Sequence, residues 1–71
     1  MAIKLRIGGR YKVRDPLWCS ANGFVTEDEI MGIDETYERH FKGKSGETYF
    51  LEGWIYGVYQ KFESDLVEEI L

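Results

Sequence analysis

The chain has 71 residues, one cysteine and a formal net charge of −4, which predicts a single small domain without an intramolecular disulfide. A chain of this length buries only about 60% of the surface that its unfolded form exposes, so its core must be small. No basic start followed by an apolar run marks a signal peptide, and no apolar run has the length of a membrane span. We therefore expect one soluble, cytoplasmic domain over residues 1–71, with no membrane contact.

The charged residues are segregated along the chain. Residues 1–14 carry five bases and no acid, and residues 15–38 carry seven acids and no base. Residues 39–44 carry three bases, and residues 45–71 carry six acids and one lysine. Two interpretations stay open: opposed electric fields that select a partner, or basic and acidic strands that lie side by side and neutralise each other. We favour the second, because cross-strand pairs of opposite charge are a common stabilising arrangement.

Apolar and basic residues alternate near the N-terminus. The odd positions hold Ile3, Leu5, Ile7, Tyr11 and Val13, and the even positions hold Lys4, Arg6, Arg10, Lys12 and Arg14. This period of two predicts a strand with one buried face. Because Gly8 and Gly9 interrupt it, we expect either one long bent strand or a short lead-in followed by a strand from Arg10. Asp15-Pro16 would end the strand, since proline has no N–H to donate to a ladder.

The next segment, residues 17–33, gives mixed signals. Residues 17–23 are expected to form a loop, because they end on the turn pair Asn22-Gly23. Within it, Trp18 is expected to cover the core, with an exposed anchor for a partner as the alternative. Residues 26–29 match a helix capping box of one or two turns. The competing interpretation is a turn between strands whose ends would lie at residues 24–25 and 30–33.

Six of the eleven aromatic residues lie in one stretch, residues 49–62 (YFLEGWIYGVYQKF), which holds only two charges. Aromatic residues dominate small cores and favour sheets, so we expect this stretch to form the central strands. The polar residues 42–46 before it predict a hairpin loop. Residues 64–71 after it predict a helix capped by Ser64, with an edge strand as the alternative.

No pattern in the chain points to catalysis. Gly43-Lys44-Ser45 resembles the end of a phosphate-binding loop, but Glu38 stands where that motif requires its first glycine. The one histidine, His40, and the one cysteine, Cys19, are too few for a zinc site, and nothing around Cys19 marks a nucleophile. We therefore expect no enzyme activity, no catalytic residue, no metal and no cofactor.

Three sets of residues are candidate binding surfaces. A core of this size cannot easily hide eleven aromatic side chains, so we expect some of the candidate anchors for a protein partner, Trp18, Trp54, Tyr56 and Tyr59, to be exposed. An aromatic edge can also pair with a second copy, which adds a homodimer to the candidate partners. The alternative nucleic-acid-binding surface consists of Lys4, Arg6, Arg10, Lys12 and Arg14. A second alternative is an acidic face that imitates DNA and inhibits a basic DNA-binding protein, formed by Glu27, Asp28, Glu29, Asp34, Glu35 and Glu38.

The overall pattern resembles the small SH3-like barrels of bacteria, phages and prophages. The resemblance is carried by a glycine before a strand (residues 7–13, IGGRYKV), a glycine-containing loop, a strand ending in Phe41, an aromatic strand and the closing residues 62–67 (FESDLV). Trp18, Cys19 and the length of the aromatic stretch depart from the family pattern. The resemblance implies a mainly β, SH3-like, partly open barrel of about five strands, with a short helical turn or a C-terminal helix at most. It also implies a non-catalytic protein-binding or nucleic-acid-binding module, and it suggests a phage-encoded modulator or inhibitor of a host protein.

Overall fold

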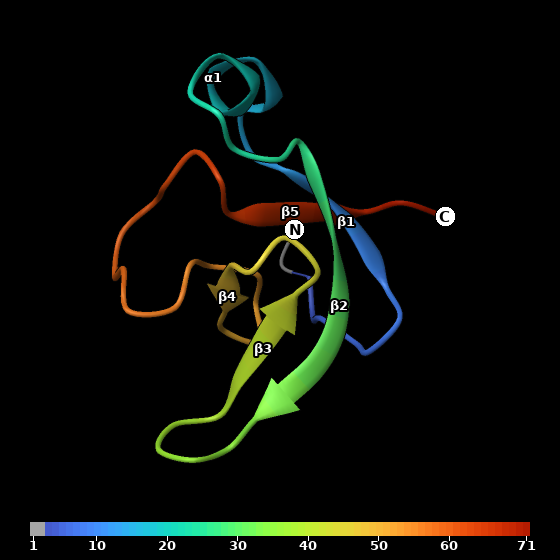
Figure 1. Ribbon diagram of the computed structural model, residues 1–71, viewed down its shortest axis with the longest axis vertical. Helices are drawn as coiled ribbons and strands as arrows, with labels where there is room; N and C mark the ends of the chain where they lie inside the picture. The colour runs from blue at the N-terminus through green and yellow to red at the C-terminus, as the bar shows by residue number, and fades with distance from the viewer. Residues whose placement is uncertain (1–2) are drawn as a thin grey trace.

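The computed structural model describes residues 3–71, which form five antiparallel strands and one short helix (Figure 1). These elements are β1 (Arg10–Val13), α1 (Pro16–Ala21), β2 (Glu27–Asp34), β3 (His40–Gly43), β4 (Thr48–Tyr49) and β5 (Leu66–Glu69). The strands make one sheet in the order β4-β3-β2-β1-β5, which curls into a half-barrel. The expectation of a mainly β, partly open barrel of about five strands is therefore confirmed. No helix within residues 3–71 is long and apolar enough to cross a membrane.

The central strand β2 is the longest and pairs with neighbours on both sides. Its first half pairs with β1, and its second half pairs with β3, with a register shift inside this second pairing between Ile30 and Gly32. An irregularity of this kind increases local twist, which lets one strand serve both parts of a curled sheet. The predicted capping box over residues 26–29 is wrong, and so is the competing turn. Residues 27–29 instead lie in β2, where they pair with β1.

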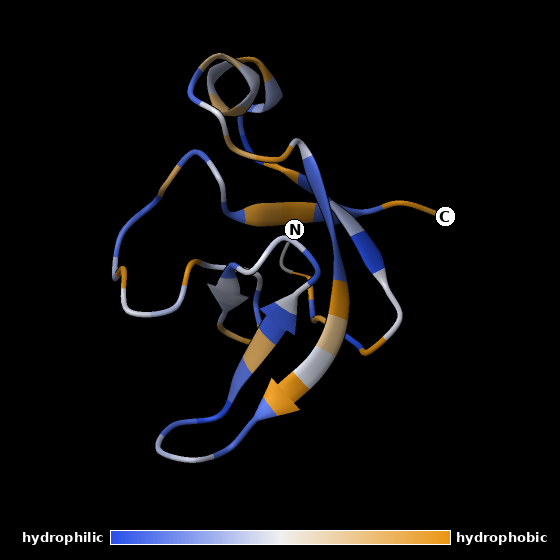
Figure 2. Ribbon diagram, in the orientation of Figure 1, coloured by the Kyte–Doolittle hydropathy of each residue, from blue (hydrophilic) through white to orange (hydrophobic). Residues whose placement is uncertain are grey.

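Among the described residues, the core consists of eight buried hydrophobic side chains, which are Leu5, Tyr11, Val13, Cys19, Ile30, Phe41, Tyr49 and Leu66. The alternation near the N-terminus predicted the burial of three of them, although Ile7 of the same pattern is exposed. β1 begins at Arg10, so the alternative of a lead-in followed by a short strand holds. In Figure 2, β3 carries one hydrophobic band between hydrophilic ones, as expected for a strand with one buried face.

Helix α1 replaces the loop that was predicted over residues 17–23. The Asp15 carboxylate accepts from the Trp18 N–H at 3.0 Å, and Pro16 occupies the first turn, where its missing N–H does no harm. Asp15-Pro16 ends β1 as predicted, but the same pair also starts a helix. The helix buries Cys19 against the core.

The aromatic stretch does not form the central strands, and that prediction is wrong. Only Tyr49 of this stretch lies in a strand, and β4 is an edge of the sheet. Gly53 and Gly57 adopt φ of 94° and 85°, a left-handed conformation that interrupts an extended chain. The Phe50 N–H donates to the Trp54 carbonyl at 2.7 Å, so the backbone bonds close a local turn. Residues 50–65 are therefore a connecting segment.

The C-terminal residues form a strand, as the alternative interpretation proposed. β5 pairs antiparallel with β1 and is the second edge of the sheet. The predicted C-terminal helix capped by Ser64 is wrong. Leu66 is buried in the core, and its N–H donates to the Gly53 carbonyl at 2.8 Å, which ties β5 to the connecting segment.

Candidate functional site

The connecting segment, residues 50–65, is irregular but held by one buried carboxylate. The side chain of Asp65 is fully buried and accepts hydrogen bonds from the Ile55 N–H at 3.0 Å and the Phe62 N–H at 2.9 Å. It also accepts from the Arg14 guanidinium at 3.1 Å. A buried charge is tolerated when it is paired and hydrogen-bonded, and Asp65 has three donors. The segment is therefore ordered before any ligand arrives.

Four rings form a continuous strip along this segment. His40 of β3 stacks on Tyr56 with ring centroids 4.3 Å apart, Tyr56 contacts Phe50 at 5.1 Å, and Phe50 contacts Tyr59 at 5.7 Å. These distances fall within the range of favourable aromatic pairs. The His40 ring is itself held by a hydrogen bond of 2.7 Å between Nδ1 and the Glu38 carbonyl. The strip places aromatic surface side by side from β3 to the tip of the segment.

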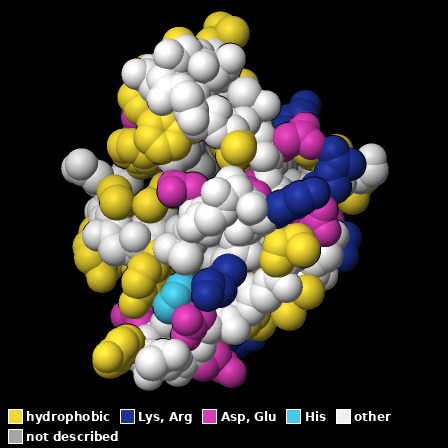
Figure 3. Space-filling view, in the orientation of Figure 1, with side chains coloured by type: hydrophobic (Ala, Val, Ile, Leu, Met, Phe, Trp, Pro, Cys, Tyr) yellow, Lys and Arg dark blue, Asp and Glu magenta, His cyan; other side chains and the backbone are white. Residues whose placement is uncertain are grey.

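A groove of about 560 Å³ opens beside this strip. We call it the aromatic groove, and it is lined by Ile3, Arg14, Phe50, Glu52, Trp54, Tyr59, Leu66 and Val67. Trp54 is 41% exposed and Tyr59 is 78% exposed, so both present ring surface to solvent. In Figure 3, hydrophobic side chains gather on the left of the molecule, over the region of the connecting segment in Figure 1. The volume is within the range of pockets that hold small ligands or peptide side chains.

Two carboxylates, those of Glu38 and Asp34, lie near one end of the strip of rings, and Lys42 lies 3.9 Å from Asp34. The pKa of Tyr56 is raised, first by partial removal from water and then by the nearby charges of Glu38 and Asp34. The pKa of Asp34 is lowered because Thr36 donates hydrogen bonds to it, with smaller contributions from His40 and Lys42. At neutral pH the Tyr56 hydroxyl therefore stays protonated and the Asp34 carboxylate stays ionised.

The structure brings together three of the four predicted aromatic anchors. Trp54 and Tyr59 line the aromatic groove, and Tyr56 belongs to the adjoining strip. Trp18 lies apart, because it stacks on Phe24 at 5.5 Å and meets the edge of Phe62 at 5.9 Å. It is half-buried and packs against the core, as expected of a cover.

Sequence reasoning missed several residues of this region. Phe50, which belongs to both the strip and the groove, and Glu52 were not singled out, and His40 and Arg14 were not assigned to this region. Phe50 and Glu52 lie inside the aromatic stretch, so the stretch itself was the signal for them. Arg14 was assigned to a different surface, and no local pattern connects it with Asp65.

The predicted nucleic-acid surface is largely neutralised by carboxylates. Three of its five bases form ion pairs, Arg6 with Glu69, Arg10 with Glu27, and Arg14 with Asp65. The two others, Lys4 and Lys12, are exposed.

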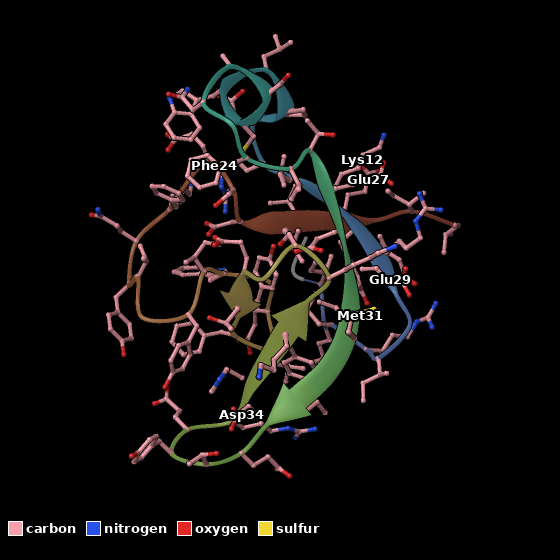
Figure 4. The ribbon with its side chains drawn as sticks, viewed as in Figure 1. Lys12, Phe24, Glu27, Glu29, Met31 and Asp34 are labelled. Atoms are coloured by element: carbon pink, nitrogen blue, oxygen red, sulfur yellow. The ribbon has the colours of Figure 1, made fainter. Side chains whose placement is uncertain are left out.

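The strand register places further opposite charges side by side, and the ion pair between Arg10 and Glu27 is diagonal to it. On β1, Lys12 lies opposite Glu27 of β2 and Glu68 of β5, and Arg10 lies opposite Glu29. Figure 4 shows Lys12 next to Glu27, and Figure 3 shows dark blue and magenta side chains intermixed on the right of the molecule. The arrangement matches the interpretation of basic and acidic strands that neutralise each other.

The six predicted acids do not form one exposed face. Asp28 is only 5% exposed, and its carboxylate accepts from the Tyr49 hydroxyl at 2.6 Å and from the Ser45 hydroxyl and N–H. Glu27 and Glu29 follow the outer side of β2, whereas Asp34 ends the strand at the opposite side of the molecule (Figure 4). The last two, Glu35 and Glu38, are exposed in the loop after β2. Asp28 is thus a structural residue that fastens β2 to the β3–β4 hairpin.

The one cysteine, Cys19, lies buried in the core. Burial raises the pKa of the Cys19 thiol, and the charges of Asp15 and Glu63 raise it further, so the thiol stays protonated at neutral pH. Within residues 3–71, no three side chains of His, Cys, Asp or Glu come together in a way that would hold a metal ion.

Comparison of the chain with models of protein families, with characterised proteins and with solved structures found no match.

Proposed function

We propose that this protein is a non-catalytic protein-binding module and that the aromatic groove is its binding surface. The observation that carries the proposal is that Trp54 and Tyr59 present their rings to solvent on a segment that Asp65 holds in place. Tryptophan and tyrosine are the residue types most enriched where interfaces gain their binding energy. A surface that is ordered beforehand also loses less conformational freedom on binding.

The size of the groove favours a short segment of a partner over a broad flat interface. Pockets that hold one ligand have volumes of about 300–1,000 Å³. The groove holds about 560 Å³ and offers two well-exposed rings, which suits one stretch of extended chain. We therefore expect binding that is specific but moderate in affinity, as in transient complexes.

The resemblance to SH3-like barrels of bacteria and phages extends this proposal. If the module is phage-encoded, its partner is a host protein, and occupation of the groove modulates or inhibits that protein in the cytoplasm. This extension rests on the resemblance, whereas the groove itself rests on the arrangement of side chains.

The proposal is tested by capture from bacterial lysate with matched variants of the protein. The double variant Trp54→Ala/Tyr59→Ala removes the exposed rings, and Tyr37→Ala is the control. Tyr37 is 93% exposed and does not line the groove. Removal of a binding anchor weakens affinity by about 2 kcal/mol or more, which is roughly thirtyfold for each ring.

We expect the wild type and Tyr37→Ala to capture the same partner and the double variant to lose it. Circular dichroism of the three proteins checks that all of them are folded. Equal capture by all three folded proteins would show that binding occurs elsewhere and would end the proposal.

A further inference from the structure

We propose that the partner segment carries an arginine or lysine side chain, which docks in the aromatic groove between the exposed rings and the Glu52 carboxylate. This inference rests on the proposed function and names the chemistry of the partner.

Two charged side chains line the groove, and only one of them is left for a ligand. The Arg14 guanidinium donates to the buried Asp65 carboxylate at 3.1 Å and to the Phe62 carbonyl at 3.3 Å. Its positive charge is therefore matched by a carboxylate that solvent does not reach. Glu52 is exposed, and none of the ion pairs within residues 3–71 includes it. The groove thus presents a carboxylate to its occupant.

The rings beside Glu52 also favour a cation. The faces of aromatic rings carry partial negative charge, and tryptophan attracts cations most strongly. Trp54, Tyr59 and Phe50 all line the groove. The protein already places one guanidinium in this way, because Arg39 lies over the Phe41 ring at 5.5 Å from its centre. A planar guanidinium can stack on a ring and pair with a carboxylate at the same time.

The overall charge of the chain acts in the same direction as the carboxylate of the groove. At the Tyr56 part of the strip, Glu38 and Asp34 are not the only charges, because Lys42 lies 3.9 Å from Asp34. The whole chain carries a net charge of −4, which attracts a basic partner at long range. A segment that carries a basic residue therefore complements the groove by charge.

The test measures the affinity of three capped, fluorescently labelled peptides by anisotropy. One alternates arginine with serine, the second replaces each arginine with citrulline, which has nearly the same shape without the charge, and the third replaces it with glutamate. A cation on an aromatic face with a nearby carboxylate contributes about 1–2 kcal/mol, so we expect the arginine peptide to bind roughly tenfold tighter than the citrulline peptide.

Two protein variants locate the effect. Glu52→Gln removes the carboxylate from the groove, and we expect it to weaken arginine-peptide binding roughly threefold or more while leaving citrulline-peptide binding unchanged. Glu29→Gln removes the same charge from β2, outside the groove, and we expect wild-type binding of both peptides. The two variants have the same net charge, so long-range attraction affects them equally.

Each contrary result overturns the inference. Equal affinity for the arginine and citrulline peptides would show that the groove does not select a cation. Preference for the glutamate peptide would assign the groove to Arg14 and an acidic partner. Equal weakening of arginine-peptide binding by both variants would show that only the net charge of the protein matters. Failure of the arginine peptide to bind would also overturn the inference. The proposed function is judged separately, since capture through Trp54 and Tyr59 uses none of these peptides.

Discussion

On the surface of β1, β2 and β5, opposite charges face each other across neighbouring strands, whereas the aromatic groove leaves large rings in contact with water. The bases Arg10 and Lys12 of β1 have acids opposite them on the adjacent strands. In the groove, Trp54 and Tyr59 have no such cover and keep much of their surface exposed. The first region is complete within the chain, and the second has surface to offer to another molecule.

The difference shows what each kind of residue contributes. An exposed ion pair adds only about 0–1 kcal/mol to stability, but like charges placed side by side would disfavour a wrong strand order. The charged surface therefore contributes mainly by favouring the correct strand neighbours, and less by adding stability. Burial of aromatic surface is worth about 25 cal/mol per Å², so rings left exposed in a folded domain can still yield that free energy on binding.

The largest effect is expected at Gly53, which positions the groove. Gly53 is buried at φ 94°, and a Cβ there would overlap the Leu66 carbonyl oxygen. Gly53→Ala should lower the free energy of unfolding by about 3 kcal/mol or more, because strain and overlap add. Gly57 has a similar φ of 85° but open space around it, so Gly57→Ala should lower the free energy of unfolding by only about 1–2 kcal/mol. Urea denaturation measures both values. Equal losses would mean that the overlap with the Leu66 carbonyl oxygen adds nothing to the cost of Gly53→Ala.

The second effect compares the same chemical change in the two regions. Asp65→Asn leaves the partly buried Arg14 without a counter-charge and one of three donors without an acceptor, so we expect a loss of about 2–3 kcal/mol. Glu69→Gln breaks the exposed pair with Arg6 and should lower the free energy of unfolding by less than about 1 kcal/mol. Both values come from urea denaturation at neutral pH. A loss at Glu69 as large as that at Asp65 would remove the distinction between the regions.

The third effect concerns Tyr49, where the end of β4 meets β2. Burial raises the pKa of Tyr49 far above its usual value of 10.0, and the hydrogen bond to Asp28 raises it further. The folded protein therefore holds this proton while the unfolded chain releases it above pH 10. The contribution is complete below pH 10 and is lost as pH rises beyond it, at about 1.4 kcal/mol per pH unit.

This loss is measured as the change in urea midpoint between pH 9 and pH 11. Tyr49→Phe has no hydroxyl proton to release at this position. Its free energy of unfolding should therefore fall less steeply over the same interval, by about 1.4 kcal/mol per pH unit. Identical slopes in the two proteins would show that the Tyr49 hydroxyl ionises in the folded state.

The smallest effect is expected for nucleic acid on the basic surface. With three of five bases paired, Lys4 and Lys12 remain for phosphate contacts. Two contacts give a slope of log affinity against log salt of roughly −1.4 to −1.8, whereas five would give roughly −3.5 to −4.5. Salt titrations of fluorescent single- and double-stranded oligonucleotides should detect at most weak binding at low salt. A slope near the steeper value would show that the ion pairs open for DNA and that the charged surface is a binding site.

Local patterns predicted the parts of the fold that depend on neighbouring residues. The period of two gave the buried face of β1 with Tyr11 and Val13, and the segregated charges indicated that basic and acidic strands would lie side by side. The polar run over residues 42–46 corresponds to the β3–β4 hairpin, where the Gly43 N–H donates to the Glu47 carbonyl at 2.8 Å. Each of these features is set by spacing within a few residues or by composition.

The features that could not be predicted depend on contacts between distant residues. Asp28 resembled a surface acid because its partners Ser45 and Tyr49 are 17 and 21 residues away. Asp65 is bonded to Arg14, 51 residues earlier. The aromatic stretch has the composition of a strand, and only the turns at its glycines and its attachment to β5 make it a connecting segment. The sequence therefore showed that this stretch is rich in aromatic residues, but not that three of its rings line one groove.

The attachment of the connecting segment at Gly53 and Asp65 has a consequence for how this domain can change. The backbone of residues 56–61 adds few hydrogen bonds to the structure, such as that from the Val58 N–H to the Ile55 carbonyl at 3.1 Å. Its sequence can therefore diverge, or be randomised in a display library, while the two fixed ends keep the loop in place. A selection on such a library would retain Gly53 and Asp65 and replace Tyr56 and Tyr59 between them. The domain is in this respect a small scaffold whose specificity can be exchanged without rebuilding its sheet.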